Sequence, residues 1–370
     1  MQGVIDSIQH NRNQELWYNL GSDLVSFCNE KHMIGQSMPL VEVYNTFVRE
    51  IVENLYPLHV AIMIDAIVRE DSSAASIVAD LKQQPFTSKN AILSQSMSLI
   101  EARISVKNGA VPDDDELAAQ FGDVATETAV IDMLLQHLYI EISMARRDHT
   151  ALVDRMIAYD SARGLAGVTL APSQEAAFAV TLITAALVAD RILTFDDVVA
   201  VECIKNPAAV DAAQAWMPAM LAAIHAGNVP EVAQMTQQHG QQLTALSAAD
   251  PVGLVLRKAK ISALLALVFS RDSQHWTFSF EEIAAVIAGT EREAEDVALA
   301  ALSHGLLRGR IQATTASVEV TWLKPRPLTL DQTRALKDKL QAWFGQVVAA
   351  NEMVVTAKDR AGQMTALFEE

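Results

Sequence analysis

Residues that interrupt helices are scarce in this chain of 370 residues, which contains 15 glycines and 11 prolines. Alanine, the strongest helix former, occurs 57 times. A fold built from strands and tight turns needs more glycine and proline than this. Hydrophobic residues make up 51% of the chain, which is enough for an extensive core. The sequence therefore predicts an all-α dominated fold of two or three domains.

The first 245 residues are predicted to form successive amphipathic helices separated by short breaks. Apolar residues spaced by three or four mark a helix over 40–55, and Pro57 is expected to begin the next one. Similar patterns predict helices over 92–108 and 130–146, and proline is expected to begin others at Pro172 and Pro230. No fixed repeat period stands out, so the pattern predicts an irregular α-solenoid of stacked helix pairs.

The pattern changes after about residue 250. A helix over 254–268 precedes two short helices, whose first turns carry capping boxes at Ser279–Glu282 and Thr290–Glu293. Two β-rich segments follow over 307–312 and 318–323, and the order of three helices and a hairpin is that of a winged helix. A third capping box, at 329–332, opens a C-terminal helix. The predicted domains are a helical-repeat arm (1–245), a winged-helix domain (246–324), and a linker with a helical tail (325–370).

The formal net charge of −17 is unevenly distributed. Residues 1–253 hold 14 basic and 31 acidic side chains, whereas residues 254–350 have a net charge of +2. Negative charge repels nucleic acid and anionic membranes, so neither is an expected partner. The longest apolar stretch, 176–189, is shorter than the roughly 20 residues of a membrane span.

The location of the protein is predicted from its N-terminus and its cysteines. The first residues show no apolar run typical of a signal peptide. Cys28 and Cys203 are the only cysteines, whereas a secreted disulfide scaffold would carry more. A reducing cytoplasmic and nuclear setting is expected.

Motifs for catalysis are absent from the sequence. It contains no P-loop, no GxGxxG, no GxSxG and no HExxH, and no two of its nine histidines are three or four residues apart. The acidic run 113–116 lacks the spacing of a calcium-binding loop and is expected to be a solvated helix start. Cys28 precedes Asn29 and Glu30, an acidic setting that does not activate a thiol. We therefore predict no catalytic residue, no cofactor and no metal site.

The winged helix is open to two interpretations. Its third helix would enter the major groove of DNA, but residues 291–296 carry a net charge of −3. Arg308 and Arg310 on the wing give weak support for DNA binding. Protein contact by strand addition is the alternative, because residues 318–322 alternate in the manner of a pairing strand. This makes Val318, Val320 and Trp322 candidate interface residues, unless the segment pairs only within its own hairpin.

Two further groups of candidate interface residues follow the wing. Trp322 and Arg326 are residue types typical of interface anchors, although a core tryptophan and a proline-stiffened linker explain them equally well. The last helix carries an apolar stripe, and a helix of this kind needs a partner, either on this subunit or on other chains. The stripe consists of Leu336, Leu340, Trp343 and Val347.

Four segments together resemble a known family. They are LRKAKISALLALVFSR (256–271), FSFEEIAAVIA (278–288), ALSHGLLRGRI (301–311) and VTWLKPRPLTLDQTRALKDKLQAW (320–343). Helical repeats that lead into a winged helix are the architecture of PCI domains. The quoted residues resemble the non-ATPase regulatory subunit 13 family of the 26S proteasome, a PCI-domain family of the lid. Residues 40–58 and 226–232 extend the resemblance toward the N-terminus.

The resemblance implies a non-catalytic scaffold subunit of the proteasome lid. Its winged helix would pack beside those of other PCI subunits, with regulatory subunit 12 as a neighbour, and its last helix would join a bundle of C-terminal helices. The helical arm would lie near the ubiquitin-receptor subunit 4. Other PCI assemblies, namely the COP9 signalosome and the translation initiation factor three complex, remain alternatives, as does a nucleic-acid-binding PCI protein.

Overall fold

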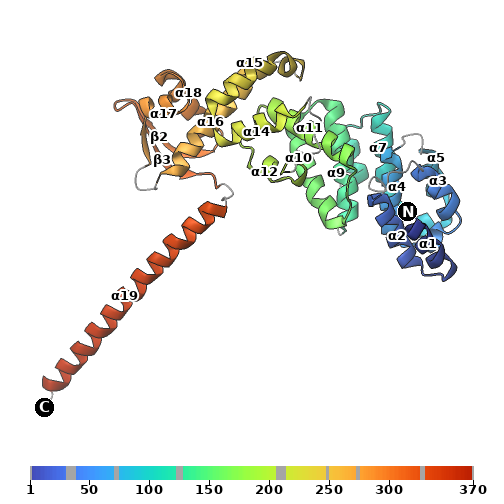
Figure 1. Cartoon of the computed structure of the whole chain (residues 1–370), viewed down its shortest axis with the longest axis horizontal. Helices are drawn as coiled ribbons and strands as arrows, with labels where there is room; N and C mark the ends of the chain where they lie inside the picture. Colours follow the sequence, from blue (N-terminus) through green and yellow to red (C-terminus); the bar gives the residue numbers. More distant parts are fainter. Residues whose placement is uncertain are drawn as a thin grey trace. The chain divides into compact units, whose positions relative to one another are not determined.

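The computed structural model describes residues 2–30, 39–70, 75–121, 128–205, 214–246, 250–271, 276–325 and 330–368. The chain divides into two compact units, Met1–Leu323 and Lys324–Glu370. Helices dominate, and one small sheet lies near the end of the first unit (Figure 1). The predicted all-α dominated fold, with helical repeats followed by a winged helix and a C-terminal helix, is confirmed. The predicted boundary at 245/246 stays a prediction.

The helical repeats begin with α1 (Gln2–Asn13) and continue through a series of helices that pack on their neighbours in sequence. The remaining helices of this region are α2 (Trp17–Glu30), α3 (Leu40–Val43), α4 (Pro57–Glu70), α5 (Ala75–Gln83), α6 (Pro85–Lys89), α7 (Ala91–Lys107), α8 (Asp114–Phe121), α9 (Ala129–Arg146), α10 (His149–Ala166), α11 (Pro172–Val188), α12 (Asp196–Ala200), α13 (Glu202–Lys205), α14 (Trp216–Ala226) and α15 (Val229–Leu246). Helices begin at Pro57 and Pro172, as predicted, since proline is tolerated in the first turn.

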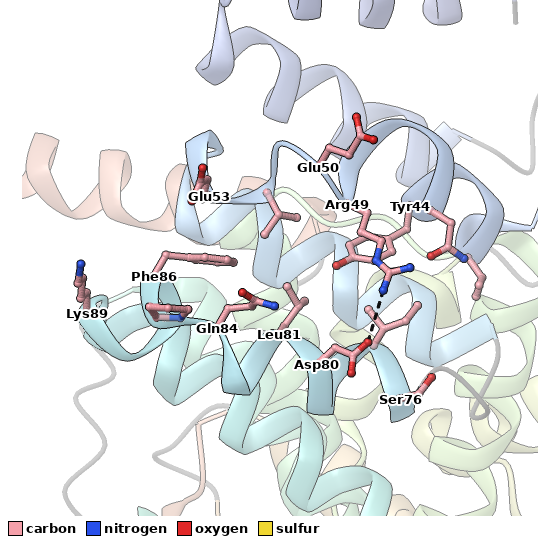
Figure 2. A pocket seen from close by; sticks show the side chains of 15 residues that line it. Tyr44, Arg49, Glu50, Glu53, Ser76, Asp80, Leu81, Gln84, Phe86 and Lys89 are labelled. Carbon is pink, nitrogen blue, oxygen red and sulfur yellow. Dashed lines mark ion pairs between the residues drawn. The ribbon is translucent and has the colours of Figure 1, made fainter.

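The segment 40–55 is not the single helix that its apolar spacing predicts. It forms α3, a π-helix (Tyr44–Val48) and a 3₁₀ turn (Val52–Asn54). Many of its residues are β-branched or aromatic and are therefore weak helix formers. With α5 and α6 this broken segment lines a pocket of about 730 Å³ (Figure 2). Arg49 and Asp80 form an ion pair in this pocket, with 3.8 Å between Nη2 and Oδ2.

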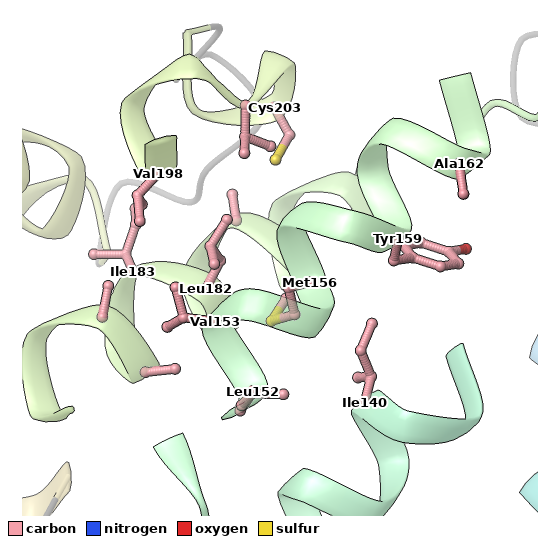
Figure 3. Close-up of a cluster of buried hydrophobic side chains, with 14 of the residues drawn as sticks. Ile140, Leu152, Val153, Met156, Tyr159, Ala162, Leu182, Ile183, Val198 and Cys203 are labelled. Carbon is pink, nitrogen blue, oxygen red and sulfur yellow. The ribbon is translucent and has the colours of Figure 1, made fainter. Parts of the chain in front are cut away.

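The core of the repeats runs continuously between adjacent helices. Figure 3 shows part of it, where α9, α10 and α11 contribute Ile140, Met156 and Leu182. Met156 and Leu182 are 1% and 0% exposed. Burial of such side chains contributes about 1.5–3 kcal/mol each relative to exposure. Neighbouring repeats therefore stabilise one another, as expected for a solenoid.

The winged helix follows directly on the repeats. It consists of α16 (Pro251–Ser270), β1 (Thr277–Ser279), α17 (Phe280–Val286), α18 (Glu291–Ser303), β2 (Leu307–Gln312) and β3 (Ser317–Leu323). The predicted hairpin is confirmed, since β2 and β3 pair antiparallel. The capping box at Thr290 and Glu293 is present in full, and the Ser279 hydroxyl accepts a hydrogen bond from the backbone N–H of Glu282.

The second unit contains the long helix α19 (Leu330–Phe368), which spans 39 residues. The helix begins at Leu330, and the capping box predicted at 329–332 stays a prediction, because residue 329 lies outside the described residues. Within this unit, no other described residue covers the apolar stripe of α19.

Candidate protein-interaction surfaces

The strand that carries Val318 and Val320 lies in the middle of the sheet. The strand order is β1-β3-β2, so β3 pairs with a neighbour on each side. Val318 and Val320 are 1% and 5% exposed and belong to the core. The expectation that residues 318–322 add a strand from another chain is therefore wrong for residues 318–320, where both edges of β3 are occupied, and stays a prediction for Thr321 and Trp322. β1, a strand of three residues, occupies the second edge.

The free edge of the sheet at β2 is poorly suited to strand addition. The register shifts between Arg308 and Gly309, which is a bulge. A Cβ at Gly309 would collide with the backbone carbonyl of Glu319, so this position requires glycine. Bulges and charged side chains are devices that protect edge strands from pairing. Contact through this domain is thus expected to use side chains rather than an extended sheet.

Of the two predicted anchors, Trp322 lies within the described residues and Arg326 does not. Trp322 is half-buried, and the guanidinium of Arg308 lies 4.7 Å from the centroid of its ring. This contact is a cation–π interaction that holds Arg308 against the wing. Arg326 lies outside the described residues.

The third helix of the winged helix, α18, presents acidic side chains to solvent. Glu291, Glu295 and Asp296 are exposed. Arg310, one of the two wing arginines, donates from Nε to Oε2 of Glu319 over 2.8 Å. Phosphate groups would therefore meet negative charge at α18 and a partly neutralised wing, which disfavours nucleic-acid binding.

All four residues predicted on the last helix are exposed on α19. Leu336, Leu340, Trp343 and Val347 are 44%, 55%, 62% and 43% exposed. The same helix exposes further apolar side chains that the sequence analysis did not name: Phe344, Val348, Met353 and Val354. Apolar side chains this concentrated on one helix are typical of interaction surfaces, and the interface role of these residues stays a prediction. The regular spacing of these residues was the signal that could have revealed the full extent of the surface.

A buried polar network inside the repeats was not predicted. Asp65 of α4 is 0% exposed, and both Arg103 of α7 and Arg69 of α4 form ion pairs with it. The Arg69 Nε lies 3.0 Å from Asp65 Oδ2, while Arg103 Nη1 donates to Asp65 Oδ1. Arg103 Nη1 also lies 2.6 Å from Nδ1 of His137 on α9. The network therefore joins α4 to α7 through an ion pair and α7 to α9 through a hydrogen bond.

The electrostatics of this network follow from burial and from its arginines. Burial alone would raise the pKa of Asp65, but the guanidinium groups of Arg103 and Arg69 hold that pKa well below its usual value. Burial lowers the pKa of His137 to about 4, and the positive charge of Arg103 acts in the same direction. Asp65 is therefore charged and His137 neutral at pH 7. The centroid of the Tyr159 ring on α10 lies 5.1 Å from that of the His137 ring, so Tyr159 packs against the network.

A second buried titratable side chain lies where the repeats meet the winged helix. Lys258 of α16 is 0% exposed, and its Nζ donates to the backbone carbonyls of Ala186, Leu187 and Ala189 over 2.6–3.0 Å. These carbonyls are at the C-terminal end of α11, where the helix leaves acceptors without partners. Burial lowers the pKa of Lys258 to about 7. Lys258 thereby caps one helix from another across the junction.

The described residues include neither a metal-binding cluster nor a membrane-spanning helix. That part of the chain contains no group of three or more His, Cys, Asp or Glu residues placed to hold a metal ion. None of its helices is both long enough and apolar enough to cross a membrane.

Stacked helical repeats, a winged helix and a long terminal helix with an apolar stripe define the class of PCI-domain proteins. Comparison with known proteins gives the family. The family model of PSD13 N-terminal repeats matches residues 4–221, more than half of the chain. The chain therefore belongs to the PSD13 family, that of 26S proteasome non-ATPase regulatory subunit 13.

Similar proteins with curated names agree with this membership. 26S proteasome non-ATPase regulatory subunit 13 of Dictyostelium discoideum is 23% identical over 351 residues, which cover 92% of this chain and 89% of the relative. The homolog B of the same subunit in Arabidopsis thaliana is 21% identical and covers 90% of this chain and 88% of the relative. 26S proteasome regulatory subunit RPN9 of Saccharomyces cerevisiae is 26% identical over 183 residues, 49% of this chain and 44% of the relative.

Proposed function

We propose that this chain is a non-catalytic scaffold subunit in the lid of the 26S proteasome regulatory particle, where it supports lid assembly and ubiquitin-dependent protein degradation. The names of its relatives favour this assembly over the COP9 signalosome and the translation initiation factor three complex. Work in the proteasome is also consistent with a cytoplasmic and nuclear location.

The observation that carries the proposal is the exposed apolar surface of α19. Trp343 and Phe344 are 62% and 65% exposed, and Leu340 lies beside them at 55%. Side chains of this size lose about 1.5–3 kcal/mol each when they stay in water rather than in a protein interior. A helix with such a surface is stable when other helices cover it, as in a shared bundle of C-terminal helices.

The other partners follow from the family and the surface chemistry. The winged helix would pack beside that of another PCI subunit, with regulatory subunit 12 as the neighbour. The side chains of α18 and β2, rather than the edge of β3, would make this contact. The helical arm would lie near the ubiquitin-receptor subunit 4. We assign structural roles to Asp65 and Lys258, because their polar atoms face the protein interior.

Deletion of residues 329–370 tests the proposal. The first unit should remain folded, with the far-ultraviolet circular dichroism of a helical protein, because its core does not include α19. The truncated chain should fail to enter the lid when it replaces the full chain in cells. Normal incorporation of the truncated chain into proteasomes would contradict the proposed role of α19.

A further inference from the structure

Arg103 of α7 has two buried hydrogen-bond donors that meet no acceptor. The side chain is 1% exposed, and its Nη1 donates to Asp65 Oδ1 and to Nδ1 of His137. Nε and Nη2, which share one edge of the guanidinium, are buried and have no hydrogen-bond partner among the described residues. This edge presents two parallel N–H groups, which is the geometry with which arginine binds anions side-on.

These two donors require an acceptor. A buried N–H group without one loses its hydration and gains nothing in return, so folded proteins satisfy nearly all such groups with protein, water or a ligand. The described part of the chain does not supply the acceptor. The free edge of Arg103 therefore points to a bound species from solution.

The charges around Arg103 indicate which species it is. Arg103 and Arg69 both form ion pairs with Asp65, so two guanidinium groups share one carboxylate. His137 is neutral at pH 7 because burial lowers its pKa to about 4. The side chains of Asp65 and Arg69 are 0% and 11% exposed, so water screens the excess positive charge poorly. A water molecule would accept the two N–H groups but leave this charge, whereas a monovalent anion does both.

The charged side chains further out already have partners of their own. Lys107 pairs with Glu141 over 3.1 Å on the far side of His137. Arg163 pairs with Asp160 over 2.6 Å. Neither pair brings a spare carboxylate to Arg103.

Tyr159 of α10 adds no negative charge to the site. It is 3% exposed, and burial raises the pKa of its hydroxyl, on which the charges of Arg69, Asp65 and Arg103 also act. The side chain is therefore a neutral phenol at pH 7 and keeps its O–H donor.

We propose that the interior of the helical repeats binds one small monovalent anion of the chloride class, held side-on by Nε and Nη2 of Arg103. The anion accepts both N–H groups and balances the second guanidinium. This site goes beyond the proposed scaffold role and does not depend on it. Its consequence is that the folded repeats are more stable when the anion is present.

The stability of the full chain at constant ionic strength tests the site. Urea titrations at pH 7 compare sodium chloride with sodium gluconate, whose anion is too bulky for a buried position. A ligand that binds only the folded state should lower the equilibrium constant of unfolding about tenfold for each tenfold rise in its concentration above Kd. Bromide should act as chloride does. A wild type whose stability does not respond to chloride would overturn the proposal.

Substitutions separate this site from other effects of chloride. Arg103→Lys keeps the positive charge but removes the paired N–H groups, so the response to chloride should disappear. Arg49→Lys makes the same change at an arginine that is 65% exposed and should keep the response. Cys28→Ser, which removes the thiol near Arg69, should also keep it. A response that persists in Arg103→Lys would contradict binding at this edge.

Bromide soaked into crystals of the wild type gives a result that needs no variant. We expect an anomalous-difference peak within hydrogen-bond distance of both Nε and Nη2 of Arg103. A water molecule at that position, or no peak, would overturn the proposal. Incorporation of the chain into the lid is a separate measurement, so failure of the anion site leaves the proposed function intact.

Discussion

Arg103 donates a hydrogen bond from Nη1 to Nδ1 of His137 over 2.6 Å in the interior of the helical repeats. A guanidinium has no acceptor, so Nδ1 of His137 must supply the lone pair. The imidazole is therefore neutral, with its proton on Nε2, which lies 3.9 Å from Oε1 of Glu141. Protonation of His137 would remove the acceptor and place a third positive charge beside Arg103 and Arg69.

The first prediction concerns the stability of the protein in acid. The unfolded chain binds a proton at His137 with a pKa near 6.5, whereas the folded protein binds it at about 4. Between these values the unfolded state holds more protons, so the free energy of unfolding falls as the pH is lowered from about 6.5 to about 4. This contribution amounts to about 3 kcal/mol. His137→Gln should flatten the slope in urea titrations from pH 7 to 4, and an unchanged slope would exclude His137 as its source.

The second prediction compares two charged residues of α7. Arg103→Met leaves Asp65 buried with one partner fewer, so the free energy of unfolding should fall by about 3–5 kcal/mol. Glu101→Gln breaks the exposed ion pair with Lys82 and should cost less than about 1 kcal/mol. Denaturant titration of both variants at pH 7 measures the difference. Equal losses would show that the network contributes no more than a surface pair.

The third prediction concerns the lysine at the junction of the repeats and the winged helix. Lys258→Met leaves three carbonyls at the end of α11 without their donor and should cost about 3 kcal/mol. Lys260→Met, two residues along the same helix, removes only the contact with Glu293 at the surface and should cost about 1 kcal/mol or less. Thermal unfolding of the two variants measures the contrast. A Lys258→Met variant as stable as the wild type would contradict the capping role.

The fourth prediction separates backbone strain from steric collision at two glycines. Gly227 and Gly305 both have positive φ, +74° and +67°. A Cβ at Gly227 would lie 2.7 Å from Cα of Ala263 in α16, whereas a Cβ at Gly305 would meet nothing within 4 Å. Gly305→Ala should cost about 1–2 kcal/mol for the left-handed backbone. Gly227→Ala should cost about 1–3 kcal/mol more, because α14 and α16 must separate. If both variants lost the same free energy of unfolding in denaturant titrations, the close approach of Gly227 to Ala263 would be contradicted.

Features set by nearby residues were predictable from the sequence. Pro57 and Pro172 begin helices because proline fits the first turn, and Thr290 with Glu293 forms a capping box whose two hydrogen bonds span three residues. The hairpin of β2 and β3 was predictable for the same reason, since both strands are close in sequence. The exposed stripe of α19 followed from the helical spacing of Leu336 to Val347.

Features that depend on distant parts of the chain were not predictable. β1 has three residues, too few for a periodic pattern, and it becomes a strand by pairing with β3 about forty residues later in the sequence. That pairing places β3 in the middle of the sheet, and Val318 and Val320 on β3 belong to the core. Asp65, Arg103 and His137 come from three separate helices, and each one alone resembles an isolated polar residue in an apolar stripe. Their opposite charges at core positions were the signal, but partners cannot be assigned without the packing of the helices.

The composition of the complex that contains this protein decides whether it is a subunit of the proteasome lid. The full chain, carrying an affinity tag, should be isolated from its own cells under native conditions and its partners identified by mass spectrometry. We expect proteasomal ATPases and lid subunits to co-purify with the wild type, and the Leu340→Asp, Val347→Asp variant to lose them. Recovery of signalosome or initiation-factor subunits in place of proteasomal ones would contradict it.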